Sequence, residues 1–207
     1  MDGVLVDTGE FHFCSWVQTL AEMGISLDRG TFRSVFGRNN ADTLAALLGR
    51  PLETQLLSRV SERKELLFRQ LIHGQARPLP GVHLWLERLR SMGVRQVIAS
   101  SAPQENIDSL VDELGVRPYF DALFAGHDLP GKPDPTLFLR AAQQMGLPPE
   151  RCIVIEDSLA GIEAARRAGM KCIAVTTTNP AGALAGADLV VERLDQLKVQ
   201  DFEKLIE

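Results

Sequence analysis

Residues 152–170 of the chain, CIVIEDSLAGIEAARRAGM, decide the fold class, because a short apolar strand passes directly into an amphipathic helix. Ser158 stands where its side chain can cap the first turn of that helix, and Gly169 stands where the helix should end. Two carboxylates, Glu156 and Asp157, occupy the junction between strand and helix. The stretch is therefore one strand-then-helix unit of the kind from which α/β proteins are built.

The same alternation runs through the chain from residue 78 onward. An apolar stretch, VRQVIASS, precedes the helical pattern QENIDSLVDELG, and the later stretches KCIAVTT and ADLVV are further strand candidates. Strands that alternate with helices require crossover connections, which place the strands parallel in one sheet. We predict a Rossmann-like α/β core with a mainly parallel sheet.

Residues 10–77 show a different pattern, with apolar side chains at three- and four-residue steps and hardly any strand character. Phe13, Trp16 and Leu20 illustrate this spacing, which is typical of helices that bury one face. We therefore expect a helical cap domain over residues 10–77, inserted into a core formed by residues 1–9 and 78–207. The stretch ARPLPG, residues 76–81, is the expected return hinge from cap to core.

Composition narrows the classes of function. The chain has 207 residues, 45% of them hydrophobic, and a net charge of -5, so it carries no basic footprint for nucleic acid. Three cysteines, an odd number, favour a reducing cytoplasm over a disulfide framework. No apolar run approaches the roughly 18 residues of a membrane span. We expect a cytoplasmic protein, a monomer, with no nucleic-acid or membrane partner.

Polar residues follow several of the strand candidates, and in open α/β sheets ligands bind at that edge. The residues are Asp2, Thr8, Ser100, Ser101, Lys132, Glu156 and Asp157. Carboxylates suit Mg²⁺, a hard cation that prefers oxygen ligands. Lysine and hydroxyl groups suit phosphate oxygens. This combination predicts Mg²⁺-dependent phosphoryl transfer on a small phosphorylated metabolite.

Four motifs in order, MDGVLVDT, VIASS, GKPDP and VIEDSLAGIEAA, resemble those of the haloacid dehalogenase superfamily. The resemblance covers essentially the whole chain and is strongest to the helical-cap branch that contains β-phosphoglucomutase and sugar-phosphate phosphatases. It implies a phosphatase that acts through an aspartyl-phosphate. The first motif of the family reads Asp-x-Asp-Gly, and its second Asp is Asp2 here. The first Asp, the nucleophile, would stand directly before Met1, and we expect the natural protein to contain it.

The resemblance also implies roles for the remaining motif residues. Asp2 would be the general acid and base, Ser100 and Lys132 would bind the transferring phosphoryl group, and Mg²⁺ would be held by the Asp2 carbonyl with Glu156 and Asp157. Further phosphate or substrate contacts are expected from Gly3, Thr8, His12, Arg38, Asn40 and Ser101.

The substrate stays open between related possibilities. In β-phosphoglucomutase a cap arginine meets a distal phosphate, whereas the matching position here is Asn40, and Arg38 lies two residues earlier. Hydrolysis of a sugar phosphate is therefore favoured over phosphomutase action. A non-catalytic homologue that binds a phosphorylated ligand is a third possibility. A receiver domain is excluded by the size of the helical insert.

Overall fold

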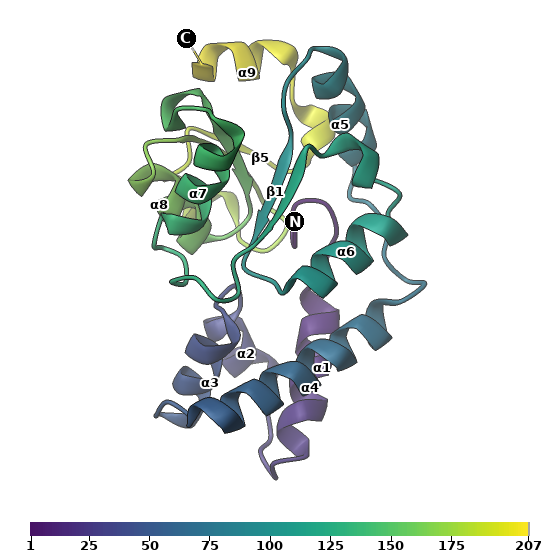
Figure 1. The fold of residues 1–207 in the computed structure, drawn as a ribbon, viewed down its shortest axis with the longest axis vertical. Helices are drawn as coiled ribbons and strands as arrows, with labels where there is room; N and C mark the ends of the chain where they lie inside the picture. The colour runs from purple at the N-terminus through teal and green to yellow at the C-terminus, as the bar shows by residue number, and fades with distance from the viewer. Residues whose placement is uncertain (207) are drawn as a thin grey trace.

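The computed structural model describes residues 1–206 and places a bundle of helices on one side of an α/β core (Figure 1). The helices of the bundle are α1 (Gly9–Ala21), α2 (Arg29–Val35), α3 (Asn40–Leu48) and α4 (Thr54–Ile72). They enclose a hydrophobic cluster of their own, formed by Trp16, Leu20, Phe32, Leu44 and Val60. An inserted helical cap is thus confirmed, while the exact limits 10–77 stay a prediction.

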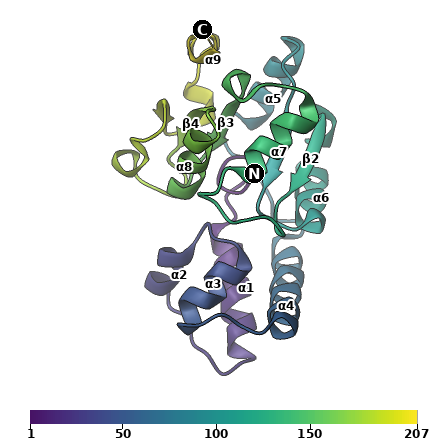
Figure 2. The ribbon, with the colours of Figure 1, turned by 60° about the vertical axis from the view of Figure 1, so that its left-hand side comes forward.

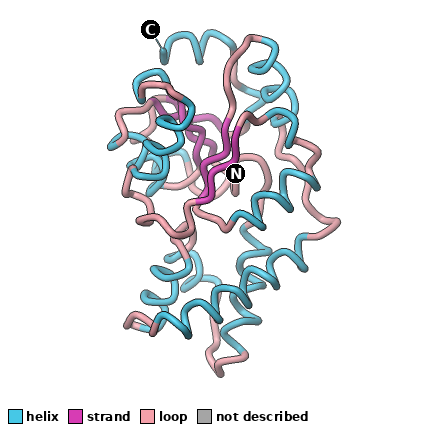
Figure 3. Tube along the Cα trace, viewed as in Figure 1, coloured by secondary structure: helices cyan, strands magenta, loops and turns pink. Residues whose placement is uncertain are grey.

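The strands of the core are parallel, as predicted, but within residues 1–206 they form two ladders and not one sheet. One pairs β1 (Val97–Ser100) with β2 (Ala122–Ala125). The other has the order β3 (Ile153–Glu156), β4 (Lys171–Val175), β5 (Leu189–Val191). Within residues 1–206, β1 pairs only with β2, and β3 pairs only with β4. Ser100 and Glu156, the last residues of β1 and β3, both line the cavity that residues of the cap also line. Figure 3 shows the strands together in the core, above the helices of the cap.

Helices cover both faces of the strands (Figure 2). They are α5 (Val82–Ser91), α6 (Gln104–Glu113), α7 (Thr136–Met145), α8 (Leu159–Arg167) and α9 (Val199–Ile206). Strand β4 shows how: Ile173 and Val175 join a cluster with α5, α6 and α9, whereas Cys172 and Ala174 join one with α7 and α8. Successive side chains of a strand point to opposite faces, so this strand is apolar on both faces from Cys172 to Val175.

The first residues complete the core beside the return from the cap. Val4, Leu5 and Val6 are buried in the same cluster as α5 and α6. The backbone N–H of Leu79 donates to the carbonyl of Leu5 at 2.9 Å. The chain therefore leaves for the cap and comes back from it at one place, as the hinge at residues 76–81 requires.

Local caps confirm the predicted ends of α8. The Ser158 side chain accepts a hydrogen bond from the Gly161 N–H at 3.0 Å, and Gly169 has a φ of 72° just past the helix. Strand β2 was not predicted, because its four residues are uniformly apolar and show no alternation. No helix in the described range 1–206 is both long enough and apolar enough to cross a membrane.

Candidate active site

One cavity of about 570 Å³ lies between the cap and the carboxyl ends of β1 and β3. Most of the residues predicted for the site line it: Asp2, His12, Arg38, Asn40, Ser100, Ser101, Lys132, Glu156 and Asp157. Gly3 and Thr8 are buried behind this lining and do not belong to it. Residues from five separate parts of the chain thus meet at one place. The outermost of them, Asp2 and Asp157, are more than 150 positions apart in the sequence.

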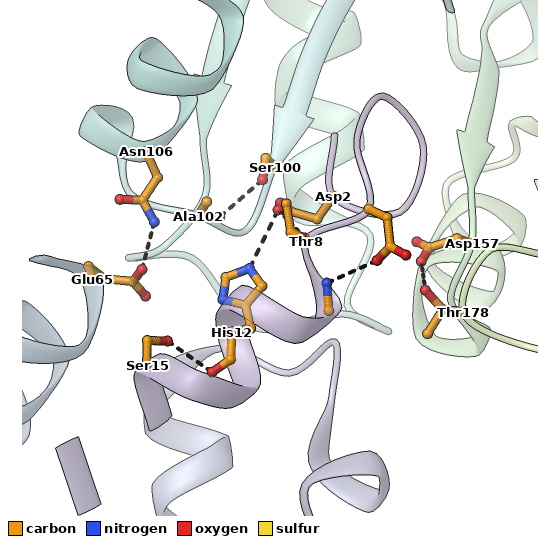
Figure 4. A network of polar contacts seen from close by, with 12 residues as sticks. Asp2, Thr8, His12, Ser15, Glu65, Ser100, Ala102, Asn106, Asp157 and Thr178 are labelled. Carbon is orange, nitrogen blue, oxygen red and sulfur yellow. Dashed lines mark hydrogen bonds and ion pairs between the residues drawn. The ribbon is translucent and has the colours of Figure 1, made fainter. Parts of the chain in front are cut away.

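Asp2 is held by two cap-side neighbours (Figure 4). The Thr8 hydroxyl donates to its Oδ1 at 2.8 Å, and His12 Nε2 lies 3.5 Å from the same oxygen. Burial alone would raise the pKa of Asp2, but the hydrogen bonds from His12 and Thr8 outweigh it and lower the pKa. The carboxylate is therefore ionised here, which is the form that accepts a proton. Thr8 thus orients Asp2, and its predicted contact with a substrate stays a prediction.

Glu156 holds Lys132 in place at the end of β3. The Lys132 ammonium donates to Glu156 Oε1, while Oε2 accepts from the N–H groups of Asp157 and Ser158, both at 2.9 Å. Burial would raise the pKa of Glu156, but Lys132 and these donors lower it. Both oxygens are engaged by protein groups. Glu156 is thus placed to orient the lysine, and its predicted role as a direct metal ligand stays a prediction.

Asp157 is fixed by the loop that follows β4. The Thr178 hydroxyl donates to Asp157 Oδ2, and the Asn179 amide donates to the Asp157 carbonyl at 3.0 Å. Burial and the neighbouring charge of Glu156 raise the pKa of Asp157. Thr178 and Asn179 were missed from the sequence, although they follow a predicted strand and the strand-end rule would have pointed to them.

Gly3 makes room for the Asp157 carboxylate. Its φ is 66°, and a Cβ added at this position would lie 1.9 Å from Asp157 Oδ2. Only glycine combines this backbone conformation with so close an approach. The phosphate contact predicted for Gly3 stays a prediction.

Among residues 1–206 there is no ready-made cluster of three or more His, Cys, Asp or Glu side chains for a metal ion. The oxygens that are present, the Asp157 carboxylate and the Asp2 main-chain carbonyl, still fit Mg²⁺. This cation commonly takes one or two carboxylates and completes its shell with waters and substrate phosphate oxygens. The site thus fits a metal that binds together with a phosphorylated ligand.

Ser100 lies at the end of β1 with its hydroxyl at the cavity. Its Oγ accepts a hydrogen bond from the Ala102 N–H at 3.2 Å, so its own O–H is left to donate (Figure 4). Ser101 follows it on the cavity wall. A hydroxyl donor between Asp2 and Lys132 suits an oxygen of a phosphoryl group.

The cap contributes a buried lysine that sequence reasoning missed. Lys64 Nζ lies 2.9 Å from His12 Nδ1 and 2.9 Å from Glu65 Oε1. Because an ammonium only donates, Nδ1 must accept, which leaves the His12 proton on Nε2, facing Asp2. Burial, with the charge of Lys64, lowers the pKa of His12 and keeps the imidazole neutral. The sequence did contain a sign, since Lys64 interrupts the apolar Val60–Phe68 stripe of α4 at the four-residue step.

Arg38 and Asn40 lie at the cap end of the cavity, but only one of them is free to meet a ligand. Arg38 is exposed there. The Asn40 amide donates to Glu65 Oε1 at 2.9 Å and so belongs to the buried network around Lys64. The position that an arginine occupies in the mutase pattern is therefore tied to a carboxylate in this protein.

A parallel α/β core with carboxylates, a hydroxyl and a lysine at its strand ends, covered by a helical insert, defines a class of capped hydrolases. The chain belongs to the haloacid dehalogenase-like hydrolases, whose family model matches residues 1–169. The resemblance seen in the four motifs is thereby confirmed.

Three similar proteins illustrate the range of the family. The chain is 34% identical to 5-amino-6-(5-phospho-D-ribitylamino)uracil phosphatase of Arabidopsis thaliana over 99% of its own length and 56% of the plant protein, so it spans just over half of that relative. It is 31% identical to a phosphorylated carbohydrates phosphatase of Thermotoga maritima, over 96% of this chain and 94% of that protein. The solved β-phosphoglucomutase of Clostridium difficile superimposes with a TM-score of 0.87 at 28% identity, covering 99% and 93% of the two chains.

Proposed function

We propose that this site hydrolyses a small phosphomonoester, a sugar phosphate or a related polyol phosphate, with the help of Mg²⁺. The observation that carries the proposal is the meeting of four groups around one cavity: an oriented carboxylate (Asp2), a hydroxyl (Ser100), an ammonium (Lys132) and a second carboxylate (Asp157). The names of the plant and Thermotoga relatives, both phosphatases, support the same reaction class.

The proposed reaction has two steps. As the substrate binds, Asp2 takes up a proton from solvent. The carboxylate of an aspartate directly before Met1 then attacks the phosphorus, the ester P–O bond breaks, and Asp2 gives that proton to the departing alcohol oxygen. Water then attacks the aspartyl-phosphate, the bond to the aspartate breaks, and Asp2 takes the proton of that water. Phosphate leaves, Asp2 returns the proton to solvent, and both carboxylates are restored.

Most of the catalytic effect would come from positioning and charge. Lys132, oriented by Glu156, and the Ser100 hydroxyl would bind the phosphoryl oxygens. Mg²⁺ held by Asp157 and the Asp2 carbonyl would supply further positive charge at these oxygens. The cap would exclude bulk water from the cavity.

Phosphomutase action is the second candidate, because the Clostridium structure is so similar in fold. Against it stands Asn40, whose amide is bound to Glu65 and offers no charge to a second phosphate. We therefore favour a monophosphate substrate with an uncharged distal end. Arg38 is the cation that a mutase would have to use instead.

The first experiment is intact mass and N-terminal sequencing of the natively expressed protein, followed by phosphate release from a panel of sugar and polyol phosphates with Mg²⁺ or EDTA. We expect an aspartate before Met1 and turnover that EDTA abolishes. A protein whose mature chain begins at Met1 and releases no phosphate would be a binding homologue, and the proposal would fail. Interconversion of sugar phosphates without phosphate release would establish the mutase.

A cytoplasmic location, a monomeric state and the absence of nucleic-acid partners stay predictions. Gel filtration with light scattering tests the oligomeric state directly.

A further inference from the structure

A largely buried polar cluster that also lines the cavity joins the cap to the core. It consists of Glu65 and Arg69 on α4 and Asn106 on α6, and we name these three residues the cap–core clasp. The Asn106 amide donates to Glu65 Oε2 at 2.6 Å, and its carbonyl oxygen accepts from Arg69 at 2.7 Å. Glu65 and Arg69 are four residues apart and so lie on one face of α4. A single core side chain thus uses both ends of its amide to hold one cap helix.

The carboxylate and the amide of the clasp are buried, whereas Arg69 is half-buried. Asn106 is 1% exposed and Glu65 is 6% exposed. No buried side-chain polar atom in the part of the chain that the structure describes lacks a hydrogen-bond partner. A satisfied network at low exposure is costly to break, because each group left behind would be buried without a partner. The relative position of α4 and α6 is therefore specified by the hydrogen bonds of the clasp as well as by apolar packing.

Side-chain contacts connect the clasp to Lys64 and His12, and His12 in turn contacts Asp2, the proposed acid and base. Glu65 accepts from Lys64 at 2.9 Å, Lys64 lies 2.9 Å from His12, and His12 lies 3.5 Å from Asp2. His12 is also stacked on Phe68 of α4, with ring centroids 4.1 Å apart. A shift of α4 relative to the core would consequently move Lys64 and His12 away from Asp2. Figure 4 shows both ends of this series, Asn106 with Glu65 and His12 with Asp2.

The core end of the clasp is equally close to the phosphoryl site. Asn106 lies on the helix that begins only a few residues after Ser100 and Ala102, the turn that points the Ser100 hydroxyl into the cavity. Asn106 is therefore close in sequence to Ser100 in the core, and it is connected to Asp2 through Glu65, Lys64 and His12 of the cap.

We propose that Asn106 is a positioning residue for Asp2, acting through Glu65, Lys64 and His12. The inference rests on the proposed function for the role of Asp2. It assigns to the first turn of α6 a task that none of the four sequence motifs includes.

The test uses Asn106→Asp, which places a second carboxylate against Glu65, in the natural full-length protein. Glu65→Gln and the double variant Asn106→Asp with Glu65→Gln complete a double-mutant cycle, and in the double variant the amide and the carboxylate have exchanged positions. Gln144→Glu, on the exposed face of α7, is the matched control. The first measurement is the imidazole NMR spectrum of His12 at fixed pH, which needs no turnover. The second is kcat/KM for phosphate release.

We expect Asn106→Asp to shift the His12 signals and to lower kcat/KM at least tenfold, while Gln144→Glu changes neither. The double variant should be less impaired than the two single effects multiplied. Asn106→Ser, which removes the amide without adding charge, replaces Asn106→Asp if that variant does not fold, and thermal unfolding identifies this case.

Unchanged His12 signals in a folded, destabilised Asn106 variant would overturn the inference and leave Asn106 a structural residue. A wild-type protein without turnover would overturn the proposed function instead. In that event the His12 spectrum still decides whether the clasp controls the surroundings of Asp2.

Discussion

At the scale of single residues, the site depends on side chains whose oxygens are already directed by neighbours. Asp2 receives the Thr8 hydroxyl, Glu156 receives Lys132, and Asp157 receives Thr178. Preorganised groups of this kind need little rearrangement when charge develops on a substrate. The roles of these three carboxylates therefore differ, although all stand at strand ends or in the adjoining opening loop.

The Asp2→Asn variant tests the acid and base role. An amide cannot give or take the proton, so kcat should fall by at least ~10²-fold, while the fold, judged by circular dichroism and thermal unfolding, is kept. Phosphate release is the measurement.

Asp7→Asn is the control, since Asp7 is exposed and accepts only the N–H of Gly9. Equal losses in the two variants would indicate a general disturbance of the opening loop. That result would contradict a special role for Asp2.

The residues that could be predicted from the sequence are those whose role depends on near neighbours in the chain or on a motif. Ser158 and Gly169 mark the ends of α8 through caps formed within a few positions, and Ser100 and Lys132 were located by motifs. Asn106 and Glu65 could not be found in this way. Each lies within an ordinary amphipathic helix, and only the packing of α4 against α6 brings them together.

At the scale of elements, the cap meets the core at a second place, the loop that carries Lys132. A Cβ added to Gly131 would lie 2.6 Å from Asn39 Nδ2 and 2.8 Å from Asp42 Oδ2. The Asn39 side chain is held in place, because its Oδ1 accepts the Asp42 N–H to begin α3. Glycine at 131 therefore allows the start of α3 to rest on the lysine loop.

Gly131→Ala should accordingly hinder closure of the cap. Overpacking costs about 1–3 kcal/mol, so we expect KM for the phosphomonoester to rise roughly fivefold or more, with the unfolding midpoint almost unchanged. Steady-state kinetics and thermal unfolding measure the two effects.

Gly182→Ala is the matched control, because an added Cβ there meets no atom within 4 Å. If KM for Gly131→Ala stays at the wild-type value, the contact between α3 and the lysine loop does not limit substrate binding.

At the scale of the whole molecule, the buried Lys64–Glu65 pair links stability to pH. Burial would raise the pKa of Glu65, but Lys64, His12 and the Asn40 amide outweigh it and lower the pKa below its usual 4.5. A depressed carboxylate pKa stabilises the folded state above the unfolded value and loses this contribution as the pH falls. The wild-type free energy of unfolding should therefore decrease as the pH falls below about 4.5.

Glu65→Gln leaves the Lys64 charge buried without its partner, which typically costs about 3–5 kcal/mol. At neutral pH the variant should be less stable than the wild type by an amount of this order, and the difference should shrink on acidification. Urea unfolding between neutral and acidic pH gives both curves.

Glu87→Gln on the exposed face of α5 is the control and should follow the wild type throughout. A gap between wild type and Glu65→Gln that does not depend on pH would show that Glu65 stabilises the protein without its charge.

The hydrogen bond between Leu79 and Leu5 has a consequence for how such proteins diversify. Both ends of the helical insert leave the core at one fastened point, so its length and sequence can change while strand order and the carboxylates at the strand ends are preserved. Catalytic chemistry and substrate choice can then be inherited separately. A lineage can change the helical cap, which selects the substrate, and keep the core, which carries the reacting groups.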